Sequence, residues 1–386
     1  MYDLGASINL VICQKSKLDD WYDHIEKYYG NEKLLYDCTI WKKKDWELFA
    51  KNPDEPCTLL INYDLIFRRP ELLKLKDFTL LLDESSVIQN ENSKRSKFIS
   101  KLHPKNVILL SGTPTGGKYE KLWSQMKLLG WNITKEMFYS QYVEYHYDDS
   151  DGFPRMVIDG YKNENRLKKK MRKYGCRFLK TEEVFDLPEQ IHQTIKINVT
   201  REYSKFKKDS IVTVGDTELV GDMVLTKMLY ERQLCGQYNI NKLSAFADLL
   251  KSTDDRLIVF YNFDKELREL HEIAFGKYDR PCSLINGHEK NLEAYENCED
   301  AITFVQYQAG AMGLNLQKAN KIIYFTPPLS SELFEQSKKR IHRIGQNRTC
   351  FYYYLTCKNS VEEKIYKTLA MRKDYTEELF NEESII

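Results

Sequence analysis

An acidic pair follows one of the most apolar stretches of this sequence. The run "LLLDE" occupies residues 80–84, with Asp83 and Glu84 at its end. An aspartate at the end of a buried strand can hold magnesium, and a glutamate beside it can orient a water molecule. The structural alternative is a solvated strand end, which is common for acidic residues at this position. Asp83 and Glu84 are therefore candidate catalytic residues, with Asp83 as the metal ligand.

A second stretch, "SGTPTGGKY" at 111–119, contains the spacing G-x-x-x-x-G-K of a phosphate-binding loop. An apolar run precedes it and a helical pattern follows it, as that motif requires. However, Tyr119 stands where the motif needs a Ser or Thr hydroxyl for magnesium, and Pro114 removes a backbone N–H from the loop. Such a loop also normally precedes the acidic strand, whereas this one follows it. We therefore interpret 112–118 as a loop with another role.

The elements that must position these residues are short apolar runs that alternate with helical patterns, such as 17–30, which Gly30 closes. Continuous apolar strands alternating with helices predict a parallel sheet covered on both faces. The runs fall into two blocks, which predicts an α/β fold with two sheets. They lie at 8–13, 57–62, 78–84 and 106–112 in the first block, and at 256–262, 282–287, 301–307, 321–326 and 351–356 in the second.

The region between the blocks is rich in Tyr, Lys and Glu and contains the basic run "RLKKKMRKYG" at 166–175. We interpret it as a helical insertion and linker. The predicted organisation is a first domain at 1–130, the insertion and linker at 131–235, and a second domain at 236–386.

Composition excludes several classes of protein. The net charge of +1 gives no overall basic field, so any contact with nucleic acid must come from local patches. The nine cysteines include no C-x-x-C pair, which indicates reduced, cytoplasmic thiols and no zinc or disulfide framework. No apolar run approaches the roughly 18 residues of a membrane helix. We expect no membrane partner.

Together, the motifs resemble the ATPase core of superfamily-2 helicases, in the Swi/Snf-like branch of double-stranded DNA translocases. The resemblance covers most of the chain apart from 131–175, and its most specific part is Q-x-x-x-R-x-x-R-x-G-Q near the end. The matching stretches are "VICQKSKLDDW" (motif Ia), "INYDLI" (Ib), "LLLDESSVIQNENSKRSKFI" (II), "LLSGTPTGGKYEKLW" (III), "RLIVFYNF" (IV) and "YQAGAMGLNLQKANKIIYFTPPLSSELFEQSKKRIHRIGQNR" (V and VI).

The resemblance implies two RecA-like lobes that bind ATP and Mg²⁺ between them. Asp83 would then hold magnesium and Glu84 would activate the attacking water. Arg340 and Arg343 would act as arginine fingers, and their spacing of three residues predicts that both lie on one helix face, with Gln336 one turn earlier.

The same resemblance implies residues that connect hydrolysis to DNA. Ser111 and Thr113 would link the two sites, and Gly310, Gly313 and Asn315 would form a tight loop near phosphates. The partner would be double-stranded DNA held mainly through its backbone, so sequence preference should be weak. Candidate DNA contacts are Lys15, Ser16, Lys168, Lys169 and Arg172, although a basic run such as 166–175 is usually a solvated face.

Two departures from the family pattern bear on activity. Motif I, G-x-G-K-[ST], is absent from the residues before motif Ia, which begins near Val11. Three explanations stay open: a fragment that has lost its phosphate loop, a separate polypeptide that supplies it, or a member that binds DNA or a partner without turnover. In addition, Ser85 and Ser86 replace the usual Ala/Gly-His, which puts the coupling of hydrolysis to motif III in question. The expected function is a DNA-dependent ATPase of bacterial or phage DNA metabolism, with a catalytically silent binding module as the alternative.

Overall fold

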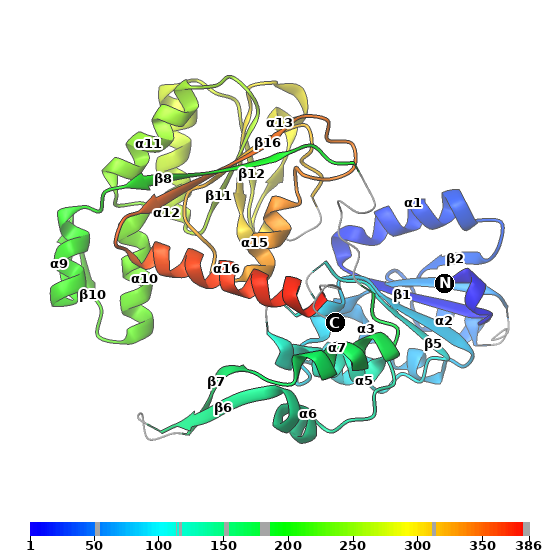
Figure 1. Ribbon diagram of the computed structural model, residues 1–386. Coiled ribbons are helices and arrows are strands. Elements are labelled where there is room, and N and C mark those ends of the chain that lie inside the picture. Colours follow the sequence, from blue (N-terminus) through cyan, green and yellow to red (C-terminus); the bar gives the residue numbers. More distant parts are fainter. Residues whose placement is uncertain are drawn as a thin grey trace. The chain divides into compact units, whose positions relative to one another are not determined.

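The computed structural model describes residues 1–50, 55–112, 114–115, 118–149, 154–177, 186–310 and 314–380 (Figure 1). The chain forms two compact units. The first comprises Met1–Phe178 with Asp374–Ile386, and the second comprises Leu179–Lys373.

Within its described residues, the first unit contains a parallel five-stranded sheet in the order β2-β3-β1-β4-β5. Strands β1, β3 and β4 are buried at every position, as the apolar runs predicted. The strand bounds are β1 Ile8–Cys13, β2 Leu34–Asp37, β3 Cys57–Asn62, β4 Phe78–Leu82 and β5 Asn106–Leu109.

Alternate residues of these strands enter two separate cores. Leu10 and Ile12 pack on one face of the sheet, while Val11 packs on the other, where Ile25 of α1 also lies. Both faces are therefore covered, which explains why the central strands contain few polar residues. The helices of this part are α1 Leu18–Tyr29, α2 Lys43–Phe49, α3 Tyr63–Ile66 and α4 Lys94–Ile99.

The rest of the first unit surrounds its own apolar core, which includes Tyr119, Trp131 and Phe138. An antiparallel hairpin in this part was not predicted from the sequence, and Tyr145 and Tyr147 on one of its faces are exposed. Figure 1 shows the hairpin, β6-β7, extending away from helices α6 and α7. The elements are α5 Leu122–Leu128, α6 Lys135–Tyr142, β6 Val143–Asp148, β7 Arg155–Tyr161 and α7 Glu164–Lys173.

The second unit contains, in the part that the structure describes, a seven-stranded sheet in the order β13-β12-β14-β11-β15-β16-β8. Its neighbouring strands are parallel except β12 and β13. The bounds are β8 Gln190–Ile197, β11 Leu257–Tyr261, β12 Cys282–Ile285, β13 Lys290–Asn291, β14 Ile302–Gln306, β15 Lys321–Tyr324 and β16 Cys350–Cys357. The predicted α/β fold with two parallel sheets, like RecA-like lobes, is confirmed.

Helices and a second hairpin complete this unit. They are α9 Arg201–Asp209, β9 Ile211–Val214, β10 Thr217–Val220, α10 Val224–Cys235, α11 Ile240–Lys251, α12 Asp264–His271, α13 Glu293–Asn297, α14 Tyr307–Gly310, α15 Ser331–Lys338 and the part of α16 Val361–Phe380 that precedes Asp374.

The structure corrects the predicted organisation of 131–235. This region is divided between the two units, and it contains two hairpins as well as helices. Strand β8 belongs to the second sheet because all eight of its residues pair with β16. The sequence analysis missed β8 because it is an edge strand whose residues are mostly exposed, so it lacks a continuous apolar run.

Candidate functional site

The acidic pair lies at the carboxyl end of β4, where three contacts position Asp83. Its backbone N–H donates to the Ile12 carbonyl (2.9 Å), which extends the β1–β4 ladder by one residue. The Trp21 indole donates to Asp83 Oδ2 (2.9 Å), and the Tyr63 hydroxyl donates to the Asp83 carbonyl (2.8 Å). The carboxylate is thereby held at the edge of the sheet, and Trp21 is a site residue that the sequence analysis missed.

Glu84 begins a tight turn in the left-handed region of backbone conformation, with φ of 52°. A residue other than glycine adopts this conformation only where its surroundings hold it, and such positions are frequent at active sites. The next backbone N–H, that of Ser85, donates to the Leu110 carbonyl (2.8 Å) at the end of β5. The acidic turn is therefore fixed to the start of the 111–118 loop.

The described part of the 111–118 loop faces this acidic turn. Two side-chain amides donate to the Pro114 carbonyl: Gln89 from beyond the turn (3.0 Å) and Gln125 from α5 (2.7 Å). Ser111 follows β5 and is partly buried. Thr113 lies outside the described residues, so its linking role stays a prediction.

The basic segment differs from its prediction. Gln336 lies in α15, but the helix ends at Lys338, so Arg340 and Arg343 lie in the turns beyond it and do not share a helix face. At this end of the helix, the Tyr352 hydroxyl donates to the Lys338 carbonyl (3.0 Å) and so satisfies a carbonyl without an intrahelical partner. The Arg340 carbonyl in turn accepts from the Leu316 backbone N–H (3.2 Å).

The side chains of the two arginines differ in their contacts. Arg340 Nη1 donates to the Leu314 carbonyl (3.3 Å), so this side chain supports the segment that contains the exposed Asn315. The Arg343 side chain, in contrast, forms no hydrogen bond or ion pair with another residue that the structure describes. Within the same set of residues, the buried Gln336 Oε1 also has no hydrogen-bond partner. Arg343 is thus the arginine available to a ligand.

The glycines predicted near phosphates are described only in part. Gly310 ends the short helix α14, which follows β14 directly. Gly313 lies outside the described residues, and its role stays a prediction.

The residues predicted to contact DNA differ in their solvent exposure. Lys15 and Ser16 are exposed directly after β1, on the same strand-end edge as Asp83. On α7, Lys169 and Arg172 are exposed, but Lys168 is buried, at 4% exposure, because it lies beside Leu167 on the face that packs on the core. The proposal that Lys168 contacts DNA is therefore withdrawn.

The exposed face of α7 carries a row of cationic side chains, which we call the cation stripe. Its members are Arg166, Lys169, Arg172 and Lys173, and none of them forms an ion pair with another described residue. Their spacing of three to four residues aligns them along one side of the helix.

Comparison with known families agrees with this geometry. Residues 5–240 match the SNF2-related domain, and residues 241–345 match the helicase conserved C-terminal domain. The chain belongs to the SNF2-related helicase family.

Relatives of this SNF2-related chain are distant and longer. It is 22% identical over 398 residues to the human SWI/SNF-related matrix-associated actin-dependent regulator of chromatin subfamily A member 1, covering 92% of this chain and 37% of the relative. An uncharacterized ATP-dependent helicase of Mycoplasma genitalium is 23% identical over 386 residues, covering 92% and 36%. The chain thus spans little more than a third of the length of these relatives.

A solved structure, the Sulfolobus solfataricus SWI2/SNF2 ATPase core in complex with dsDNA, is similar with a TM-score of 0.41 and 19% identity. The match covers 96% of this chain and 82% of that one. Among the described helices, none combines the length and the apolar character needed to cross a membrane.

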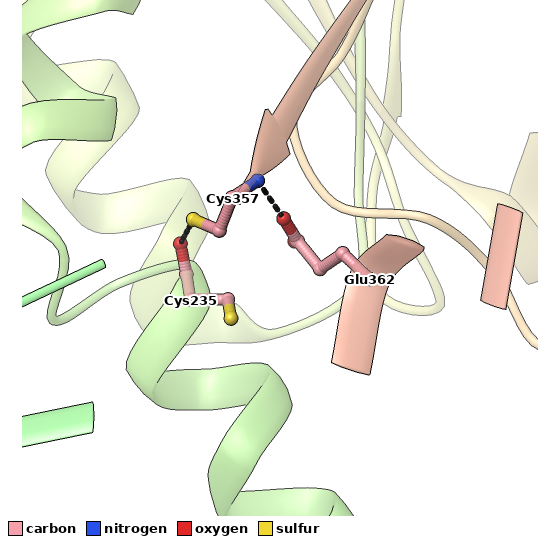
Figure 2. Close-up of side chains that lie close together, drawn as sticks. All are labelled: Cys235, Cys357 and Glu362. Carbon is pink, nitrogen blue, oxygen red and sulfur yellow. Dashed lines mark hydrogen bonds between the residues drawn. The ribbon is translucent and has the colours of Figure 1, made fainter. Parts of the chain in front are cut away.

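The second unit of the SNF2-related chain also holds a buried cluster of Cys235, Cys357 and Glu362, whose ligand-type atoms lie within 4.8 Å of one another (Figure 2). The contacts of this cluster hold the surrounding elements together. Glu362 Oε1 accepts from Lys242 Nζ (2.6 Å), and Oε2 accepts from the Cys357 backbone N–H (2.9 Å). Burial raises the pKa of the Cys235 thiol well above its usual value, which keeps it protonated. Because both carboxylate oxygens are occupied and a buried lysine cation is adjacent, these residues do not favour a metal ion.

Glu266 is a second buried carboxyl group of this unit. Its Oε2 accepts from the backbone N–H of Asn262 (2.8 Å) and Phe263 (3.2 Å) and from the Thr326 hydroxyl (2.9 Å). These bonds connect the ends of β11 and β15. Burial outweighs them and raises the pKa of Glu266 to about 7.

We expect this carboxyl group to make folding stability pH-dependent. Since its folded pKa lies above its unfolded value, the stability it contributes is complete below about pH 4.5 and is lost as pH rises through about 7. The free energy of unfolding should fall by about 2–3 kcal/mol between pH 5 and pH 8 from this group. Urea unfolding followed by circular dichroism at both pH values measures this fall in the free energy of unfolding. Glu266→Gln should remove this part of the difference, and an unchanged difference in that variant would contradict the assignment.

Proposed function

We propose that this chain is the core of an ATP-dependent DNA translocase, in which ATP hydrolysis drives movement along duplex DNA with weak sequence preference. The observation that carries the proposal is the geometry of the acidic turn in a SNF2-related chain. Asp83 is held by Trp21 and the β1 backbone, and Glu84 follows it in a constrained conformation.

The acidic turn fits the magnesium ion of a bound nucleotide. Asp83 Oδ1 accepts no hydrogen bond from another described residue, so an oxygen ligand stays available for magnesium. Bound Mg-ATP supplies the phosphoryl group that is transferred to water. Glu84 would orient that water, and Arg343 would neutralise negative charge that develops on the phosphate.

Contact with DNA is proposed for two exposed sites. Lys15 and Ser16 lie beside the acidic turn, at the same edge of the sheet. The cation stripe of α7 offers charges that can bind phosphate oxygens without reading bases. Binding through these residues should weaken steeply as salt concentration rises.

The test is phosphate release from Mg-ATP by the purified chain, with and without duplex DNA, beside Glu84→Gln. We expect DNA to stimulate release, and the variant to lower it by about 10²- to 10⁴-fold, as for loss of a general base. Retained DNA binding by the variant is the control for folding. If the wild-type chain binds DNA but releases no phosphate, the proposal fails for this chain by itself, and a silent binding module is favoured.

A further inference from the structure

A buried glutamine connects the acidic turn to the 111–118 loop. Gln125 lies on α5 at 4% exposure. Its Oε1 accepts from the Ser85 hydroxyl (3.0 Å), and its Nε2 donates to the Pro114 carbonyl (2.7 Å). Ser85 is itself 1% exposed and follows Glu84 directly. One amide thus contacts both loops at the same time.

Only a side chain with a donor and an acceptor can make both bonds. An amide offers a carbonyl oxygen and an NH₂ group, whereas leucine offers neither and an ionised glutamate cannot donate. Gln89 also donates to the Pro114 carbonyl, but its side chain does not bond to Ser85. Gln125 is therefore the described side chain that joins Ser85 to Pro114.

Burial makes this connection energetically significant. A buried polar group that loses its hydrogen-bond partner destabilises the protein, because no water replaces the lost bond. If the 111–118 loop moved while the acidic turn stayed in place, Gln125 would lose one of its two partners in a site closed to water. The two loops are therefore expected to shift together.

We propose that Gln125 is a positioning residue that, through Ser85, transmits the position of Pro114 to Asp83 and Glu84. The proposal rests on the function proposed above, because its consequence is control of hydrolysis by DNA. The family usually has Ala/Gly-His where this chain has Ser85 and Ser86, which put the coupling of hydrolysis to motif III in question. The proposal accounts for this coupling through the Ser85 hydroxyl and the side-chain amide of Gln125 on α5.

The kinetic test compares Gln125→Leu and Ser85→Ala with the wild-type chain. With saturating duplex DNA, each variant is expected to lower kcat about tenfold with KM for Mg-ATP unchanged, because a positioning change acts on the chemical step. The double variant should fall no further, since both changes break one link. Ser124→Ala is the matched control: its hydroxyl donates to the Ile88 carbonyl (2.8 Å) from the same helix but does not join the two loops.

A second measurement needs no turnover. The Lys118 backbone N–H donates to the Thr115 carbonyl (3.0 Å), so its hydrogen exchange reports on the 111–118 loop. Ser85→Ala should raise this exchange rate several-fold in the wild-type background and leave it unchanged in a Gln125→Leu background. Ser124→Ala should have no effect.

The two measurements distinguish this proposal from the proposed function. If no phosphate is released but the exchange pattern holds, the proposed function fails and the link stands. If Ser85→Ala leaves Lys118 exchange unchanged, or Gln125→Leu keeps its DNA-stimulated kcat within twofold, the link is overturned.

Discussion

Replacing Arg343 by alanine is expected to lower DNA-stimulated kcat at least about 10³-fold, the usual effect of losing an arginine finger. The reason is that its guanidinium group has no partner among the described residues and so remains available for developing phosphate charge. For the same reason, its removal leaves no protein group without a hydrogen-bond partner. Thermal stability should therefore stay close to that of the wild-type chain.

The matched comparison is Arg340→Ala. Arg340 donates to the Leu314 carbonyl, so its loss should lower both the unfolding temperature and kcat. Arg343→Lys keeps the charge but loses the forked geometry, and we expect it to recover only part of kcat. Steady-state phosphate release and thermal unfolding separate these cases. If Arg343→Ala retains kcat within tenfold, the finger assignment is wrong.

The second large effect is on stability. Lys242 and Glu362 form an ion pair with side chains 0% and 1% exposed. Burial by itself lowers the pKa of Lys242, but the adjacent Glu362 carboxylate outweighs burial, so the pKa lies above its usual value and the lysine stays charged. Removing one partner leaves an uncompensated buried charge. Lys242→Met or Glu362→Leu should therefore lower the free energy of unfolding by about 3–5 kcal/mol.

The chain provides its own control at the next position. Glu363 pairs with Lys196 (2.6 Å), but both side chains are substantially exposed, so Glu363→Leu should cost about 0–1 kcal/mol. The double variant Lys242→Met/Glu362→Leu should recover much of the loss, because two apolar side chains replace two charges. Urea unfolding measures the free energy of unfolding of these four variants relative to the wild-type chain. Equal costs at positions 362 and 363 would contradict the burial argument.

The sequence by itself determined the central strands of the two sheets and the location of the acidic pair. Central parallel strands such as β1 and β4 are buried on both faces, so a continuous apolar run is sufficient to predict them. Asp83 and Glu84 could be recognised because they follow such a run immediately. The motif order also identified the family, since each motif is a short local pattern.

Tertiary structure decided the features that depend on residues far apart in the chain. Helix α15 ends at Lys338, so Arg340 and Arg343 do not share a helix face, although their spacing suits one. Packing buries Lys168 within a basic run whose neighbours are exposed. Strand β8 belongs to a sheet because β16 pairs with it. The pattern of apolar and polar residues in β8 does not by itself predict this pairing.

The contacts of Gln125 show the same limit most clearly. Ser85, Pro114 and Gln125 lie on different elements, and a glutamine in a helical pattern carries no local sign of what it bonds to. Local sequence determines which elements form, because backbone geometry and burial act over a few residues. The hydrogen bonds that position a site depend on which elements pack together, and that is determined only when the whole fold has formed.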